Sequence, residues 1–204
     1  SDQFTGAGYG LQSYMKPAMC LQWLENAVGT PQFDKAMQAY YRDWKFKHPY
    51  PEDLKKSWAD AGMDADWFLQ AMTTRKQADF KLEKVEKVAG GYRLKVRNKG
   101  DLNAPFPVTA LRDGQPAGTQ WYPAPASRSE TVVYAADQVD HFVIDRDFQT
   151  LDVRRQNNSS RKAVQVAAFA PLENPSARTL GILPWLGWNN YDKTMAGLLL
   201  YNPP

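Results

Sequence analysis

The sequence is poor in the residues that most often hold a metal ion or attack a substrate. Its 204 residues include one cysteine, Cys20, and two histidines, His48 and His141, which lie far apart in the chain. A single cysteine excludes an intrachain disulfide, and no three-ligand zinc site can be drawn from local spacing. Cys20 falls in a helical apolar pattern, so we expect a buried structural thiol there and not a nucleophile.

Several catalytic motifs are also missing. The sequence contains no His-Glu-x-x-His, no phosphate-binding G-x-x-x-x-G-K-[ST] loop and no G-x-S-x-G turn. Gly6-x-Gly8-x-Gly10 has no strand before it, so we expect a flexible loop and not a dinucleotide site. The carboxylates Asp64 and Asp66 are typical of a helix cap and not of an acid–base pair. No self-contained catalytic centre follows from these motifs.

Neither a long apolar run nor a surplus of one charge is present. Lys and Arg number 25 against 22 Asp and Glu, a net charge of +3, and the cations are scattered. Without a basic stripe interleaved with aromatic residues, we do not expect nucleic-acid binding. No apolar segment has the length that a bilayer requires, so we expect no transmembrane segment.

The sequence is rich in apolar and aromatic residues. Apolar residues make up 43% of it and aromatic residues 13%, with seven tryptophans. This content is sufficient for the core of one large domain or of two to three small ones. The aromatic rings could pack in the core and between domains or form a carbohydrate-binding face, and we favour packing.

The periodicity is helical before Asp79. Apolar residues recur at steps of three and four up to Gly29, which is a natural helix stop. Thr30 is predicted to cap the next helix, with Pro31 at its first position. The prolines of 48–51 end that helix. Two shorter helices are expected around Trp58 and after Asp64, which makes four helices in a small bundle.

After Asp79 the apolar residues alternate, which indicates strands. Gly90-Gly91 predicts the turn of a hairpin between 80–88 and 92–97. Further strands are expected at 108–111, 131–134 and 141–144. This spacing favours a small antiparallel β-sandwich.

The last segment follows a polar stretch. Asn157-Asn158-Ser159-Ser160 is predicted to be a linker, with strands at 164–169 and 196–201 beyond it. Residues 184–188 are expected to lie between these strands, and 189–193 to form a turn. The predicted fold class is α+β: a small helical bundle over 1–76, an antiparallel β-sandwich over 77–156 and a partial β tail over 157–204. We expect the tail to be an incomplete β unit or to dock on the sandwich.

The order of several short motifs resembles the aminopeptidase N-like family of zinc metallopeptidases, the gluzincins. In the helical part these are Tyr14-x-Lys16-Pro17-Ala18, Leu21-x-x-Leu24, Gly29-x-x-x-Phe33, Tyr40-x-x-x-Trp44-x-Phe46-x-His48-Pro49 and Asp66-Trp67-Phe68. In the β part they are Asp79, Asn98-Lys99-Gly100, Pro105-x-Pro107-Val108, Val143-Ile144-Asp145 and Asn157-Asn158. The run Trp188-Asn189-Asn190-Tyr191-Asp192-x-x-Met195-x-Gly197-Leu198 resembles a C-terminal β extension of some bacterial members.

The resemblance implies one catalytic residue in this chain, Tyr14. In the family, zinc activates a water that attacks the scissile carbonyl of a peptide, and a tyrosine in this motif donates a hydrogen bond to the resulting oxyanion. The zinc ligands and the general base of the family have no counterpart here and are expected in an N-terminal part of the same protein. The resemblance therefore implies zinc in the parent enzyme, none in this chain alone, and no activity of the chain alone. A periplasmic or envelope location is suggested only by the bacterial-type tail.

Two further interpretations remain open at this point. The sandwich and its tryptophans could form a non-catalytic envelope module that binds a glycan or a protein. Alternatively, the chain could belong to an inactive family relative that acts as a scaffold. Several tryptophan rings on one exposed face would favour the binding module. An open, uncovered surface near Tyr14 would favour the enzyme fragment.

Overall fold

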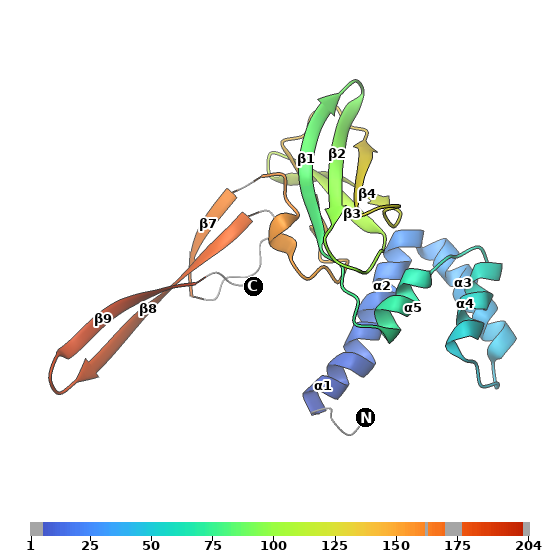
Figure 1. Cartoon of the computed structure of the whole chain (residues 1–204), viewed down its shortest axis with the longest axis horizontal. Helices are drawn as coiled ribbons and strands as arrows, with labels where there is room; N and C mark the ends of the chain where they lie inside the picture. The colour runs from blue at the N-terminus through green and yellow to red at the C-terminus, as the bar shows by residue number, and fades with distance from the viewer. Residues whose placement is uncertain (1–5, 162, 170–176, 202–204) are drawn as a thin grey trace.

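A computed structural model describes residues 6–161, 163–169 and 177–201 of the chain. It has an α+β fold in which helices come first and strands follow (Figure 1). Helix α1 (Gly6–Gly10), the π-helical turn η1 (Leu11–Met15) and α2 (Lys16–Val28) follow one another without a break. Helices α3 (Thr30–Trp44), α4 (Pro51–Asp60) and α5 (Asp66–Thr73) complete the bundle.

The helix boundaries follow from local chemistry. Gly29, with φ of +86°, ends α2 in a conformation that side chains with a Cβ avoid. Thr30 was expected to cap α3 but is its first residue, and Gly29 takes the cap position. The Thr30 hydroxyl instead lies 2.9 Å from the Glu25 carboxylate, so it is not available to the α3 backbone.

The helices meet over aromatic side chains. Trp23 of α2 lies against Trp67 of α5 with ring centroids 4.6 Å apart, and Trp58 of α4 meets Phe68 of α5 at 5.3 Å. Trp23 is fully buried, and its indole N–H donates to the Pro105 carbonyl, 2.9 Å away, at the entry to the sandwich. One continuous set of buried residues runs from α2 into the sandwich.

Two three-stranded antiparallel sheets form the sandwich. One has the order β1 (Phe80–Val88), β2 (Gly91–Asn98), β5 (Ser129–Tyr134), and the other β4 (Gln115–Tyr122), β3 (Phe106–Arg112), β6 (His141–Ile144). Phe80 and Phe106 meet across the core at 5.0 Å, and Phe142 receives Tyr92 and Tyr134 at 5.1 and 5.2 Å. The predicted hairpin is confirmed, with Val88 paired to Gly91 across its turn.

The segment predicted as a linker is part of the sandwich. Asn158 follows the short helix η2 (Arg155–Asn157) and is fully buried. Its backbone carbonyl accepts from the Ile144 N–H at 2.9 Å, and the Ser160 N–H donates to Phe142. The prediction of a linker at 157–160 was therefore wrong, because these residues extend the pairing of β6.

The last strands form a third sheet that projects from the body (Figure 1). Strand β7 (Ala163–Ala168) pairs in parallel with β8 (Ala177–Asn189), and β8 forms a hairpin with β9 (Lys193–Tyr201). Residues 184–188 belong to β8, so the expectation that they lie between strands was wrong. The Asn189 carboxamide oxygen accepts from the Tyr191 and Asp192 N–H groups and shapes the predicted turn.

Candidate functional site

Tyr14 lies on the π-helical turn η1, where the backbone widens. The N–H of Lys16 donates to the Leu11 carbonyl five residues earlier, which is the π-helical pattern. Such turns redirect side chains and recur at functional sites. The Tyr14 side chain is 67% exposed.

The surface around Tyr14 is apolar and uncovered in the part of the chain that the structure describes. Tyr9 lies edge-on to Tyr14, with ring centroids 6.1 Å apart. Leu11, Met15 and Met19 are also exposed, and we call these five residues the N-terminal apolar surface. Within the described ranges no group hydrogen-bonds the Tyr14 hydroxyl, so its O–H is available to a ligand.

The opposite face of α2 explains this exposure. Cys20, Trp23 and Leu24 are fully buried against the other helices and the sandwich. Because a helix has one apolar stripe facing its core, the residues a half-turn away point outward. The buried stripe therefore fixes the direction in which η1 presents Tyr14.

A second feature, a cleft, lies at the junction of helices and sandwich. It has a volume of about 790 Å³ and is lined by α2 residues, by the loop after α5 and by the loop before η2. Tyr14 is not among the lining residues, whereas Lys16 and Asp152 are. We call it the junction cleft.

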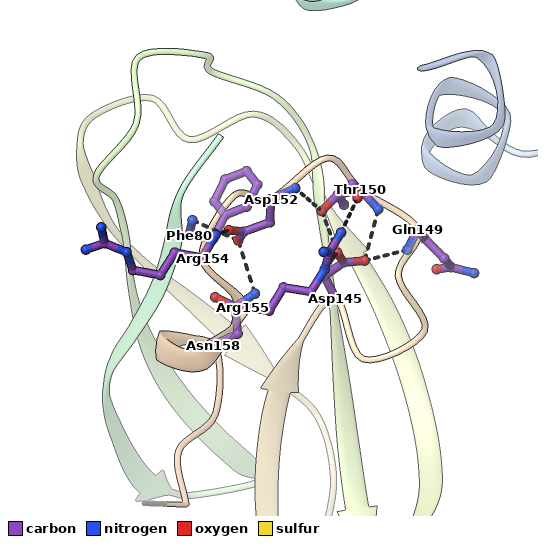
Figure 2. Close-up of polar contacts among 8 residues, drawn as sticks. All are labelled: Phe80, Asp145, Gln149, Thr150, Asp152, Arg154, Arg155 and Asn158. Atoms are coloured by element: carbon purple, nitrogen blue, oxygen red, sulfur yellow. Dashed lines mark hydrogen bonds and ion pairs between the residues drawn. The ribbon is translucent and has the colours of Figure 1, made fainter. Parts of the chain in front are cut away.

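Two buried carboxylates stabilise the wall of this cleft (Figure 2). Asp145 accepts from the Gln149 and Thr150 N–H groups at 2.6 and 3.0 Å, from the Thr150 hydroxyl at 2.7 Å and from the Arg155 Nε at 3.1 Å. Burial raises the pKa of Asp145, although the Thr150 hydrogen bonds and Arg155 act against the rise.

Asp152 is the second carboxylate and ties the loop to β1. It accepts from the Phe80 N–H at 3.0 Å, the Arg154 N–H at 2.8 Å and the Asn158 amide at 3.1 Å. Burial raises its pKa to about 6, against the lowering effect of these three donors. Neither Asp145 nor Asp152 was predicted to be functional. The one hint in the sequence was that Asp145 directly follows an apolar strand, which would favour its burial.

The other candidate residues are not brought together. His48 is exposed after α3, while His141 is buried in β6, where burial lowers its pKa. Cys20 is buried, and burial raises the pKa of its thiol. Asp64 accepts from the Asp66 N–H at 3.2 Å, but Ala65 and not Asp64 takes the N-cap position of α5.

The described residues hold neither a metal cluster nor a helix suited to a bilayer. Residues 6–161, 163–169 and 177–201 contain no group of three or more His, Cys, Asp or Glu side chains placed to hold a metal ion. In the same ranges no helix combines the length and apolarity that crossing a membrane requires.

Comparison with known proteins gives a structural likeness only. No protein-family model matches the chain, and no curated protein matches it. Among solved structures, it is similar to the crystal structure of Legionella pneumophila aminopeptidase A in complex with aspartic acid, with a TM-score of 0.59 and 17% sequence identity. The chain shares a fold with part of that protein. The likeness covers 72% of this chain and 18% of the length of the aminopeptidase chain.

Proposed function

We propose that this chain is the C-terminal part of a zinc-dependent aminopeptidase that removes N-terminal residues from peptides. In this proposal Tyr14 donates a hydrogen bond to the oxyanion that forms at the scissile carbonyl. The observation that carries the proposal is the exposed Tyr14 hydroxyl on a π-helical turn, inside an uncovered apolar surface. The likeness to part of an aminopeptidase supports it.

A phenol suits this role for a chemical reason. Tyrosine stays protonated at neutral pH and is acidic enough to donate a strong hydrogen bond. A donor fixed in place stabilises the charge that develops in the transition state more than it stabilises the neutral substrate. Removal of one such donor elsewhere costs roughly 10²- to 10³-fold in rate.

The described residues do not fit a zinc site, because no three metal-binding side chains converge. We therefore assign no metal ligand to this chain and no step of the reaction to a metal held by it. Under the proposal, the zinc ligands and the general base lie in an N-terminal part of the same protein. We expect the 204-residue chain by itself to cleave no peptide.

The tryptophans favour this proposal over an aromatic binding module. Trp185 and Trp188 are exposed but point to opposite sides of β8, because successive side chains of a strand alternate. They therefore share no stacking face. Trp185 instead covers Gly187 and Gly197, where a Cβ would lie 2.5 and 3.3 Å from its ring.

The test compares wild type with Tyr14→Phe in the uninterrupted gene product. Zinc content and hydrolysis of an aminoacyl-anilide are measured. We expect one zinc per chain, and a kcat that falls roughly 10²- to 10³-fold in the variant with little change in KM. Tyr41→Phe is the matched control, since Tyr41 is 68% exposed on α3 and should leave kcat unchanged.

Two outcomes would contradict the proposal at different points. An uninterrupted protein with neither zinc nor turnover would exclude the aminopeptidase and leave a scaffold or binding module. Turnover that survives intact in Tyr14→Phe would keep the aminopeptidase and remove Tyr14 from its mechanism.

A further inference from the structure

The junction cleft has the size and composition of a ligand site, and Tyr14, the residue that the proposed function uses, does not line it. Its volume of about 790 Å³ lies inside the range of roughly 300–1,000 Å³ that small-molecule sites occupy. Most of its wall comes from α2, residues 74–78 and residues 151–155, and Gln12, Ala71 and Leu102 complete it. A ligand there would contact both the helical part and the sandwich.

Cations from these segments converge on the cleft. Lys16 comes from α2, Arg75 and Lys76 from the loop after α5, and Arg155 from η2. Within the described residues, the side chains of Lys16 and Arg75 have no hydrogen-bond or ion-pair partner. Lys76 donates to the Gln70 side chain at 2.7 Å, which is a neutral partner and leaves its charge uncompensated.

The acidic groups neutralise only part of this charge. Asp152 is the one acidic lining residue, and both of its oxygens accept from inside the fold: Oδ1 from the Arg154 N–H, and Oδ2 from Phe80 and Asn158. Asp145 pairs with Arg155 at 3.1 Å. Since the donors to Asp152 are uncharged, its negative charge offsets one cation, and Lys16, Arg75 and Lys76 leave a smaller net excess of positive charge on the lining.

The rest of the lining is mixed, because Gln12, Thr74 and Gln77 are polar and six other residues are apolar or small. Met19, Ala71, Ala78, Leu102, Leu151 and Val153 supply the apolar part of the surface. A cleft with cations and an apolar lining recognises a ligand that carries both an oxyanion and an apolar group.

We propose that the junction cleft binds a small amphipathic oxyanion, a carboxylate or phosphate joined to a short apolar group. Lys16 and Arg75 hold the oxyanion from two sides, and the apolar lining receives the rest of the ligand. Because the two cations lie on different segments, the bound ligand connects α2 to the loop that leads into β1.

The test measures binding and does not depend on peptide hydrolysis. Probes are N-acetyl-leucine, its neutral amide and inorganic phosphate, titrated into the isotope-labelled chain while amide chemical shifts are followed. We expect N-acetyl-leucine to bind with a Kd of about 1 mM, with shifts at Gln12, Gln77 and Val153, which line the cleft. The neutral amide should bind at least about tenfold more weakly than N-acetyl-leucine. Added salt should weaken the binding of N-acetyl-leucine, because it screens the charges.

Variants assign the binding to the two cations. Lys16→Ala combined with Arg75→Ala should weaken the binding of N-acetyl-leucine about tenfold or more. The matched control, Lys45→Ala with Lys87→Ala, removes the same charge from exposed positions outside the cleft and should bind as wild type does. If the double variant misfolds by circular dichroism, Arg75→Glu alone replaces it, since Arg75 is exposed on a loop.

Each remaining result decides the proposal. Phosphate binding at the same amides without N-acetyl-leucine binding would show an anion site alone and overturn the apolar part of the proposal. Absence of binding by both anions up to about 20 mM, equal binding of the acid and the amide, or wild-type affinity in the cleft variant would overturn the whole proposal.

Discussion

At the scale of single residues, Asp145 and Asp152 explain how a polar loop is held inside the molecule. Asp145 has a left-handed φ of +52°, and its carboxylate receives the N–H groups of the loop that follows. Asp152 then fixes that loop to the first residue of β1. A buried carboxylate with all its donors in place avoids the cost of an unpaired charge, whereas removing the donors would impose it.

Asp152 should make stability depend on pH. Its pKa of about 6 in the fold exceeds the ordinary value of 3.8, so the folded state binds the proton more tightly than the unfolded state. This contribution is fully present below pH 4 and is lost as the pH rises through 6; the rise corresponds to about 3 kcal/mol. We expect Asp152→Asn to be less stable than wild type at pH 4.

Urea unfolding at pH 4, 5, 6 and 7 measures this difference. The deficit of Asp152→Asn in free energy of unfolding should shrink by up to about 3 kcal/mol between pH 4 and 7. Asp34→Asn, at an exposed position on α3, should show no such trend. A difference that is constant with pH, or that grows toward pH 7, would show that Asp152 does not retain its proton in this way.

At the scale of elements, the turn after β2 shows why a glycine is required. In Asn98-Lys99-Gly100 the Asn98 side chain accepts from the Gly100 N–H at 3.0 Å, which closes the turn. A Cβ at Gly100 would lie 2.1 Å from the Gln77 carbonyl oxygen. The turn therefore packs directly on the loop that enters β1, and only glycine leaves room.

Gly100→Ala should be destabilising because backbone atoms cannot give way as side chains do. We expect a loss of about 2 kcal/mol or more in the free energy of unfolding, measured in guanidinium chloride. Gly10→Ala is the control, because Gly10 has helical dihedrals and a Cβ added there would meet nothing within 4 Å. That control should gain up to about 1 kcal/mol, and a Gly100→Ala chain as stable as wild type would contradict the close approach.

Two strands escaped sequence analysis for identifiable reasons. Strand β4 contains Pro116 and Gly118, which are typical turn residues, but it lies at the edge of its sheet, where both are tolerated. Pro184 interrupts the pattern of β8. The β7 pairing ends at Ile182, so Pro184 lies where β8 has a partner on only one side.

At the scale of the whole molecule, Trp23 links the helical part to the sandwich. Its ring packs on Trp67, and its N–H donates to the Pro105 carbonyl ahead of β3. Buried residues are continuous through this point. The domain boundaries after residues 76 and 156 stay predictions. The hydrophobic core runs continuously from the helices into the sandwich and so does not mark a boundary between them.

Trp23→Phe should lower the free energy of unfolding, because Trp23 connects the helices to the sandwich. The change removes volume from the buried Trp23 site and leaves the partly buried Pro105 carbonyl without its donor, and we expect a loss of about 2–4 kcal/mol. Far-ultraviolet circular dichroism at a helical wavelength and tryptophan fluorescence should report one shared unfolding transition in wild type. Trp121→Phe, at a partly exposed position of β4, serves as the control. Two separate transitions in wild type would show that the helices and the sandwich unfold independently.

The sequence by itself determined the division into helices before Asp79 and strands after it, because period, turn residues and proline positions act locally, but it missed β4 and β8 and expected a loop where α1 lies. It also determined Tyr14 as the candidate catalytic residue, through motif order and not through geometry. Only the tertiary structure decided that 157–160 packs into the sandwich, that Asp145 and Asp152 are buried, and that Lys16 and Arg75 reach one cleft. Those features depend on contacts between residues far apart in the chain. A local sequence pattern cannot predict them, because burial depends on which distant segments pack together and exclude water.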